Sequence, residues 1–410
     1  MTEEYDVIIV GGGPSGSSCA AFLAKTGRKV CLLDRATFPR DKTCGDGISG
    51  RSVGILTELG LMNEFLSAGT EHQNMYGVTF SSPSGVTVPL PSAKTNANKD
   101  VPPGLVCRRE VFDNVLFQNA KKLSAKTMEG FMCTDLLIEN GTVIGVKGNF
   151  EGKPVELRAK VIVGADGAGG MIARKLGQNN ADENHQCAAI RCYYEGVEDM
   201  SDRIELHFVK EALPGYFWVF PLPGKKANVG IGILVPEMKK QKINLQKVMF
   251  EIIEKNPLFK ERFKNAKRIT EVKSWLLPMG SKRMKLASNG CLLIGDAASL
   301  IDPFTGEGIG NALSSGRQAA KTINEAFEKK DFSETGLSGY QTALFAEIGP
   351  ELDANYRMQR LAGHPWLLNL MINKASRSKF VKGAISDALM NPNNHNKMTD
   401  PLFILRILFA

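Results

Sequence analysis

The sequence of 410 residues lacks several features that would point to other protein classes. Its eight cysteines include no C-x-x-C pair and no Cys/His spacing suited to zinc or an iron–sulfur cluster, so we expect reduced thiols and no metal site. No apolar run reaches the roughly 18 residues that span a bilayer. No basic segment precedes an apolar core at the start, so no secretory signal is expected. The expected location is the cytoplasm, with peripheral contact to the inner face of the membrane left open.

Acidic residues are scarce in one part of the chain. The formal net charge is +8, and residues 238–285 hold 14 Lys/Arg against 4 Asp/Glu. No aromatic or nucleic-acid-binding motif is interleaved there, so a solvated basic face is favoured and nucleic acid is not an expected partner. A third interpretation is attraction to anionic lipid headgroups or to a diphosphate substrate.

A glycine motif near the start predicts a dinucleotide site. The apolar run 5–10 reads as a buried parallel strand, a helical stretch follows, and residues 29–33 supply the next strand. Gly11, Gly13 and Gly16 form G-x-G-x-x-G between that strand and that helix, and Asp34 ends the second strand. The glycines allow a tight turn and close approach of the backbone to a pyrophosphate, which the helix amides would bind, while Asp34 would accept hydrogen bonds from ribose. The cofactor-binding residues expected here are Gly11, Gly13, Pro14, Ser15, Gly16, Asp34 and Arg35.

The remaining pattern predicts two interleaved domains. Helical periodicity is expected at 53–66 and 111–123, and a strand pair within 142–164. Residues 187–235 contain successive strand-like runs that favour an antiparallel sheet, and residues 291–296 read as a strand that returns to the first sheet. We therefore expect an α/β fold in which a Rossmann-like cofactor-binding domain (1–75, 105–180 and 286–350) is interrupted by a mostly antiparallel β substrate-binding domain (76–104 and 181–285), followed by a helical C-terminal region (351–410).

Two distant segments resemble the glutathione-reductase-like flavoproteins with the p-hydroxybenzoate-hydroxylase fold. The first is GCLLIGD at 290–296, followed by Ala297, Ala298, Pro303, Gly306, Glu307, Gly308 and Asn311. In that family the aspartate at the position of Asp296 contacts the ribityl chain, which implies FAD as the cofactor. The helix that begins near Gly308 and Ile309 would direct its positive end toward the flavin.

The second segment is R-x-x-F-D, which begins at Arg109. In the family this arginine reaches the cofactor, and the resemblance also places Cys133 on the adenine side. The A-D-G segment at 165–167 matches, but Gly169 and Gly170 replace the usual polar pair, so a structural turn is expected there.

The segment around Cys44 and the aromatic segment 214–221 are similar to geranylgeranyl reductases. In that family a K-x-C-G loop lies beside the isoalloxazine ring, and a Y-x-W-x-F-P strand lines a long apolar cavity. The corresponding residues here are Cys44, Gly45 and Gly47 in the loop, and Tyr216, Trp218, Phe220 and Pro221 in the strand. Alternation on a strand independently directs Tyr216, Trp218 and Phe220 to one face, as a cavity wall or as an ordinary sheet core.

The resemblance implies reduction of isolated double bonds in geranylgeranyl or related isoprenoid lipids, with an isoprenoid lipid or a prenyl diphosphate as substrate. Such an alkene needs a hydride from the reduced flavin and a proton from Cys44 or a bound water, although Cys44 is equally consistent with simple packing. The external electron donor, NADPH or ferredoxin, stays open. The alternatives are a flavin monooxygenase or halogenase of this fold and a quinone-linked electron-transfer flavoprotein dehydrogenase.

The C-terminal tail is apolar and basic. It contains Trp366, Leu367, Leu368, Leu370 and Met371, and it ends in an apolar run at 401–410. A tail of this kind predicts either peripheral contact with a membrane or closure of the substrate cavity.

Overall fold

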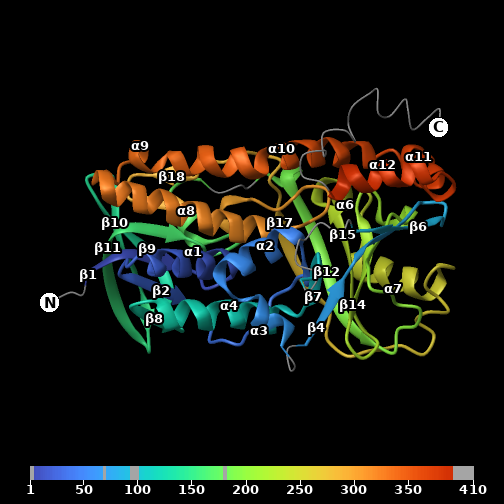
Figure 1. Ribbon diagram of the computed structural model, residues 1–410, viewed down its shortest axis with the longest axis horizontal. Coiled ribbons are helices and arrows are strands. Elements are labelled where there is room, and N and C mark those ends of the chain that lie inside the picture. The colour runs from blue at the N-terminus through green and yellow to red at the C-terminus, as the bar shows by residue number, and fades with distance from the viewer. Residues whose placement is uncertain (1–3, 68–70, 93–100, 179–181, 391–410) are drawn as a thin grey trace.

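The computed structural model describes residues 4–67, 71–92, 101–178 and 182–390. Figure 1 shows an elongated molecule with one sheet at the left, a second sheet at the right and long helices along the top. The apolar run at the very end of the tail, 401–410, lies outside the described residues.

The first sheet is mixed and forms around β1. Its strands are β1 (Glu4–Val10), β2 (Val30–Asp34), β8 (Lys126–Glu129), β9 (Met132–Glu139), β10 (Thr142–Phe150), β11 (Lys153–Gly164), β18 (Ala287–Ser288) and β19 (Cys291–Leu293). The order is β18-β19-β11-β1-β2-β8, with β10 and β9 continuing from β11. β1 pairs in parallel with both β11 and β2, and β19 pairs in parallel with β11. The predicted strand–helix–strand unit and the late returning strand are both confirmed.

Helices cover this sheet. They are α1 (Pro14–Lys25), α2 (Gly50–Leu59), α3 (Met62–Leu66), α4 (Arg109–Leu123), α5 (Met171–Lys175), α8 (Ile309–Lys329), α9 (Glu334–Leu337) and α10 (Gly339–Ala362). α1 packs along α8, where the Ser18 hydroxyl donates a hydrogen bond to Leu313 O over 3.1 Å. The single helix expected at 53–66 is two helices, because Gly60 takes a left-handed conformation (φ 81°) that ends α2. Residue 351, expected to open the C-terminal region, lies within α10.

The second sheet is almost entirely antiparallel. Its strands are β5 (Gly77–Ser81), β6 (Thr87–Pro91), β12 (Gln186–Glu195), β13 (Ile204–His207), β14 (Tyr216–Leu222), β15 (Lys226–Leu234), β16 (Lys267–Arg268) and β17 (Lys273–Pro278). The order is β16-β12-β15-β14-β13-β5-β6, with β17 paired to β12. The pair β13 and β5 is parallel, an exception that agrees with the prediction of a mostly antiparallel domain.

The second sheet has one face covered by helix and the other turned toward the rest of the molecule. α6 (Val235–Lys240) and α7 (Leu245–Lys255) follow β15, and Met249 and Ile252 of α7 pack with the buried side chains of one face. Within the basic segment, Lys239 and Lys255 form exposed ion pairs with Glu183 and Glu251. These contacts are those of a solvated basic surface.

Two small assemblies join the main sheets. β3 (Gly47–Ile48), β7 (Gly104–Cys107) and β4 (His72–Met75) form a short antiparallel sheet. α11 (Pro365–Arg377) and α12 (Lys379–Met390) pack against β6, at the upper right of Figure 1. Among the described residues, no helix is both long enough and apolar enough to cross a membrane.

Candidate active site

A cavity of about 1080 Å³ connects the first sheet with the second. One end is formed by the carboxyl ends of β1 and β2 and the start of α1, and the other by the aromatic face of β14. The loops 40–50 and 303–309 line the region between these ends. The carboxyl edge of a parallel sheet is the usual place for a nucleotide, so the cavity has a nucleotide end and an apolar end.

The glycine turn at the nucleotide end leaves the backbone open to a ligand. Gly11 has φ 112°, and a Cβ there would lie 2.1 Å from Ala165 O, so only glycine fits. At Gly13 the nearest neighbour of such a Cβ would be Arg40 Nη2 at 3.7 Å, which leaves the backbone accessible. Gly16, by contrast, does not line the cavity. Its Cα faces Gly11 O, where a Cβ would come within 1.8 Å, so the third glycine serves helix packing instead of ligand contact.

The N-terminus of α1 faces the same space. Gly13 is its N-cap and offers no side chain to satisfy the first amides, while Pro14 and Ser15 line the cavity. Uncapped amides at a helix start suit phosphate oxygens. Asp34 closes the turn from β2: its carboxylate accepts hydrogen bonds from Gly12 N at 2.6 Å and from Ala36 N at 2.7 Å, and it lines the cavity with Arg35. A carboxylate has further lone pairs, so Asp34 can also accept from a ribose hydroxyl.

The start of α8 forms the second wall of the cofactor space. Gly308 is its N-cap without a side-chain hydrogen bond, and Gly306, with φ 71°, lets the loop turn beneath it. Gly306, Gly308 and Ile309 line the cavity, as does Asp296, which forms an ion pair with Lys42 at 3.4 Å. All four residues expected from the second flavin motif therefore lie along one cavity.

Two carboxyl groups brace the loop before α8. Asp302 accepts hydrogen bonds from Phe304 N and Thr305 N, and burial raises its pKa to about 6. Glu307 accepts from Gly310 N at 2.6 Å, in the first turn of α8, and burial raises its pKa as well. These bonds hold the loop in the shape that exposes the start of the helix.

Arg109 and Cys133 also line the cavity. Arg109 forms two hydrogen bonds with Asp113, of 2.6 and 2.7 Å, and its side chain is buried. Burial raises the pKa of Asp113, but Arg109 and Arg40 outweigh it and hold that pKa below its usual value. Burial raises the pKa of Cys133 to about 12, so its thiol stays protonated. The arginine is fixed at the cavity wall by the aspartate of its own motif.

The apolar end is a wall of three aromatic rings from β14. Tyr216, Trp218 and Phe220 line the cavity in sequence, with ring centroids 6.1 Å and 6.4 Å apart. The Tyr216 hydroxyl donates to Thr305 O over 2.5 Å, which ties the wall to the loop before α8. The alternation of β14 thus places the aromatic face on the cavity, and Pro221 does not line it because an adjacent strand residue faces the other side.

The loop around Cys44 runs against this wall. A Cβ at either Gly45 or Gly47 would come within 3.1 Å of the Phe220 ring, so the loop approaches the aromatic strand at close contact. Cys44, which is half-buried, lines the cavity together with both glycines. The loop and the aromatic wall therefore meet where the nucleotide end passes into the apolar end.

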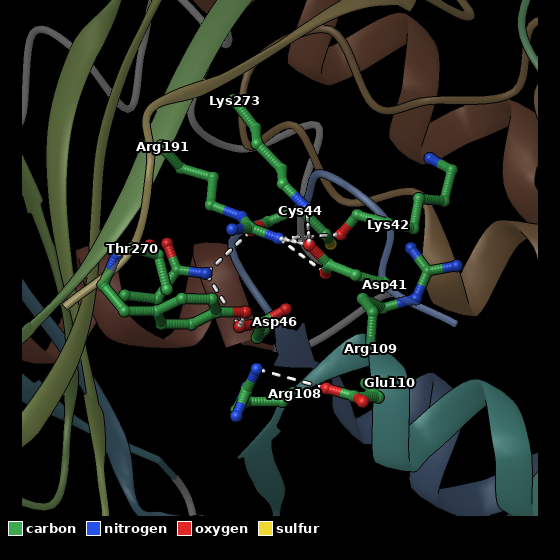
Figure 2. A network of polar contacts seen from close by, with 12 residues as sticks. Asp41, Lys42, Cys44, Asp46, Arg108, Arg109, Glu110, Arg191, Thr270 and Lys273 are labelled. Carbon is green, nitrogen blue, oxygen red and sulfur yellow. Dashed lines mark hydrogen bonds and ion pairs between the residues drawn. The ribbon is translucent and has the colours of Figure 1, made fainter. Parts of the chain in front are cut away.

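Polar residues that the sequence did not single out hold this loop in place. Figure 2 shows the side chains of Arg191 and Lys273 converging on Asp41, with Cys44 and Asp46 beside them. Arg191 Nη2 lies 2.7 Å from Asp41 Oδ1, and Lys273 Nζ lies 2.6 Å from Asp41 Oδ2. Arg191 interrupts the apolar run CAAIRCYY, and this was the sequence signal that could have identified it. A buried arginine is usually paired with a carboxylate, so an acidic partner could have been expected.

The comparisons with known proteins agree with this geometry. A family model described as "FAD binding domain" matches residues 4–342. A digeranylgeranylglycerophospholipid reductase of Methanocella arvoryzae is 32% identical over 365 residues, which cover 88% of each chain. The chain belongs to the geranylgeranyl reductase family of FAD-binding oxidoreductases. It is also 31% identical to a menaquinone reductase of Mycobacterium tuberculosis over 79% of this chain and 78% of the relative.

A solved structure supports the same family. The geranylgeranyl bacteriochlorophyll reductase-like protein of Thermoplasma acidophilum aligns with a TM-score of 0.83 and 27% identity, over 97% of this chain and 99% of that one. The cofactor of this family member is FAD. The open backbone at Gly13, the start of α1, which has no side-chain cap, and the carboxylate of Asp34 fit an adenine dinucleotide.

Proposed function

We propose that the protein hydrogenates isolated double bonds in the isoprenoid chain of a lipid. The observation that carries this proposal is the continuity of the cavity. The same space that suits FAD extends over Tyr216, Trp218 and Phe220 and onward past aliphatic side chains that include Val78, Ile204, Leu206 and Leu277. A long apolar space of this kind fits a branched hydrocarbon chain.

The proposed reaction adds a hydride to one alkene carbon and a proton to the other. Reduced FAD, when bound, supplies the hydride and is thereby oxidised, and an external donor restores it with two electrons, either as a hydride from NADPH or in two one-electron steps from ferredoxin. The residues of the chain have three tasks: the aromatic rings hold the alkene, stabilise positive charge that develops on carbon, and exclude water. The proton comes from the Cys44 thiol or from a water held beside it, since Cys44 lies where the loop meets the wall.

An anaerobic reaction tests this proposal. The photoreduced flavoprotein is mixed with a geranylgeranyl glycerophospholipid, and flavin reoxidation is followed by absorbance while the lipid is analysed by mass spectrometry. We expect reoxidation together with a product that has gained two hydrogen atoms per reduced bond. The phytanyl analogue, which has no double bond, is the matched control and should not reoxidise the flavin. Absence of turnover with every prenyl lipid would refute the proposal.

The same assay separates the rival functions. Menaquinone, included in the substrate panel, would reoxidise the flavin with an unchanged side chain if the protein only passed electrons to a quinone ring. Oxygen uptake coupled to hydroxylation or halogenation of a substrate would identify an oxygen-dependent enzyme of this fold. Cys44→Ser should retain flavin and lipid binding but turn over more slowly if the thiol supplies the proton, and it should match the wild type if water does.

We also propose that the helical C-terminal end contacts an anionic membrane surface. Leu367, Leu368 and Met371 of α11 are buried in the cluster that contains Trp218 and Phe220, so α11 covers the apolar end of the site. Trp366 and Phe380, in contrast, are 65% and 64% exposed. Basic residues follow on the same two helices, at Lys374, Arg377, Lys379 and Lys382. Exposed aromatics beside basic side chains suit the lipid headgroup region.

Flotation with vesicles tests this contact. The wild type should float with vesicles of phosphatidylglycerol and less with those of phosphatidylcholine, and W366S/F380S should lose most of this binding. Ile138→Ser, which removes a 52% exposed apolar side chain from β9 at the opposite end of the molecule, is the matched control. Equal flotation of all three proteins would refute the membrane contact.

A further inference from the structure

Asp46 is a buried acid that the proposed reaction does not use. It lies in the loop after Cys44, is fully buried, and adopts φ 69°, a left-handed conformation that costs energy for a residue other than glycine. Its side chain does not line the cavity, so it does not contact the bound substrate. A buried charge in a strained backbone position calls for a role that compensates for both costs.

The contacts of Asp46 link three parts of the fold. Oδ2 accepts a hydrogen bond from the Tyr193 hydroxyl at 2.6 Å and another from Asn228 Nδ2 at 2.7 Å. The backbone carbonyl accepts from Cys107 N at 3.0 Å. Within the described residues, Oδ1 has no hydrogen-bond partner. The loop is therefore held to β12, β15 and β7 through one residue.

Asn228 connects Asp46 to both the Cys44 loop and the aromatic wall. Its Nδ2 donates to Cys44 O at 2.7 Å as well as to Asp46, and its Oδ1 accepts from Trp218 Nε1 at 2.9 Å. The indole N–H is a donor only, so the orientation of the amide is determined by its neighbours. One fully buried amide thus sets the position of the Cys44 loop relative to the central ring of the aromatic wall.

We propose that ionised Asp46 is the positioning residue of this site, which acts through Asn228 to hold the Trp218 indole and the Cys44 loop in register with each other. This inference rests on the proposed function for its effect on turnover, but not for its effect on Trp218. Asp46 transfers no proton in the reaction. Its carboxylate strengthens two hydrogen bonds, and protonation would turn both into weaker neutral ones and free the amide to move.

The surroundings place the ionisation of Asp46 within an accessible pH range. Burial raises its pKa to about 6, while the hydrogen bonds from Tyr193 and Asn228 and the charges of Arg191 and Arg109 lower it from a still higher value. The titratable and charged groups that face it are Tyr193 and Arg191 of β12, Arg109 of α4 and Cys107 of β7. Burial raises the pKa of both Tyr193 and Cys107 far above this range, so neither titrates with Asp46.

Fluorine NMR of the holoenzyme provides a test that does not need turnover. The sequence has three tryptophans, so protein labelled with 5-fluorotryptophan should give a signal from each, and the Trp218 signal is assigned by its loss in W218F. We expect the chemical shift of Trp218 to titrate with a midpoint near the pKa of about 6 that burial produces. Asp46→Asn, which keeps the shape but removes the charge, should abolish this titration.

Two further variants make the assignment specific. Asp302→Asn removes another buried carboxyl group whose pKa is raised to about 6, and the Trp218 titration should persist in this matched control. Tyr193→Phe removes one hydrogen bond that lowers the pKa of Asp46, so its midpoint should move to higher pH. Should Asp46→Asn fail to fold, the shift in Tyr193→Phe decides the matter alone. A Trp218 signal that does not titrate, or that titrates in Asp46→Asn, would overturn the proposal.

Turnover supplies the second readout. In the wild type, kcat with a geranylgeranyl lipid should decline as the pH falls through 6, within the range set by the pKa of Asp46. Asp46→Asn should lower kcat by up to about 100-fold, the loss that a displacement of roughly 1 Å can cause, with little change in KM and no acid limb. An unchanged kcat and acid limb in Asp46→Asn would refute positioning by Asp46. If the wild type itself reduces no prenyl lipid, the proposed function fails, whereas the NMR titration still decides the role of Asp46.

Discussion

The position of Trp218 in the aromatic wall requires a glycine at residue 230. Gly230 lies on β15 directly opposite Trp218 of β14, and a Cβ at this position would come within 2.2 Å of Trp218 Cζ2 and 2.4 Å of Ile190 O. Gly230→Ala would therefore force the indole outward by roughly 1 Å to restore an ordinary contact of about 3.5 Å. That displacement is toward the cavity, which Trp218 lines.

The expected cost follows from two terms. Overpacking in a well-packed interior typically costs about 1–3 kcal/mol. The hydrogen bond from Trp218 Nε1 to Asn228 Oδ1, now 2.9 Å, would be strained or lost, and an unsatisfied buried polar group costs about 1–3 kcal/mol more. We expect the free energy of unfolding to fall by about 2–5 kcal/mol, and KM for a prenyl lipid to rise about tenfold, equivalent to roughly 1.4 kcal/mol.

Gly232 provides a matched control on the same strand and the same face. A Cβ there would lie 3.4 Å from Cys187 Sγ and 3.8 Å from Trp218 Cζ3, which are ordinary contacts. Gly232→Ala should change the free energy of unfolding by less than about 1 kcal/mol. Urea denaturation and steady-state kinetics on both variants make the comparison. If the two variants lost the same stability and kept the same KM, the reasoning about the wall would be refuted.

Three further variants test other parts of the structure. Gly11→Ala should purify without FAD, seen as loss of the flavin absorption, because its Cβ would lie 2.1 Å from Ala165 O; Gly54→Ala, whose Cβ meets nothing within 4 Å, should stay yellow. The folded pKa of Asp46 lies above its ordinary value, so its ionisation opposes folding at neutral pH. Asp46→Asn should therefore gain up to about 3 kcal/mol relative to the wild type between pH 4 and pH 7, and an unchanged difference in melting temperature across this range would contradict the buried charge. Glu205→Gln should lower the free energy of unfolding by about 3 kcal/mol, because the amide carries no charge to pair with Arg262 and offers only one acceptor oxygen in place of two; retention of wild-type stability in urea would contradict this expectation.

Local patterns in the sequence were sufficient for much of the fold. The apolar run 5–10, the glycine turn and Asp34 together predicted a parallel strand, a helix and a second strand, because all three signals lie within one short segment. Alternation along β14 was likewise enough to place Tyr216, Trp218 and Phe220 on one face. The division of the helix at 53–66 was missed because an isolated glycine within an apolar pattern does not by itself reveal a left-handed conformation.

The polar support of the site could not be predicted in the same way. Asp46, Tyr193 and Asn228 come from a loop and two strands that are far apart in the sequence, and each residue type is common on protein surfaces. Their meeting depends on how the second sheet docks against the loop after β2, which no local pattern encodes. Gly16 and Pro221, both members of recognisable motifs, were expected at ligands although neither lines the cavity, because Gly16 faces the Gly11 carbonyl and Pro221 faces the other side of β14.

The position of β19 has a consequence for how the protein is made. β11 is flanked by β1 on one side and by β19 on the other, and α1 lies against α8, so the N-terminal segment packs against segments that come about 280 residues later in the chain. During synthesis the first sheet cannot be completed until β19 has left the ribosome. The wall of the cofactor space that α8 forms is completed later still. The supply of flavin during synthesis should therefore influence the yield of native protein. A ligand that contacts both α1 and α8 stabilises the native state relative to incompletely folded states.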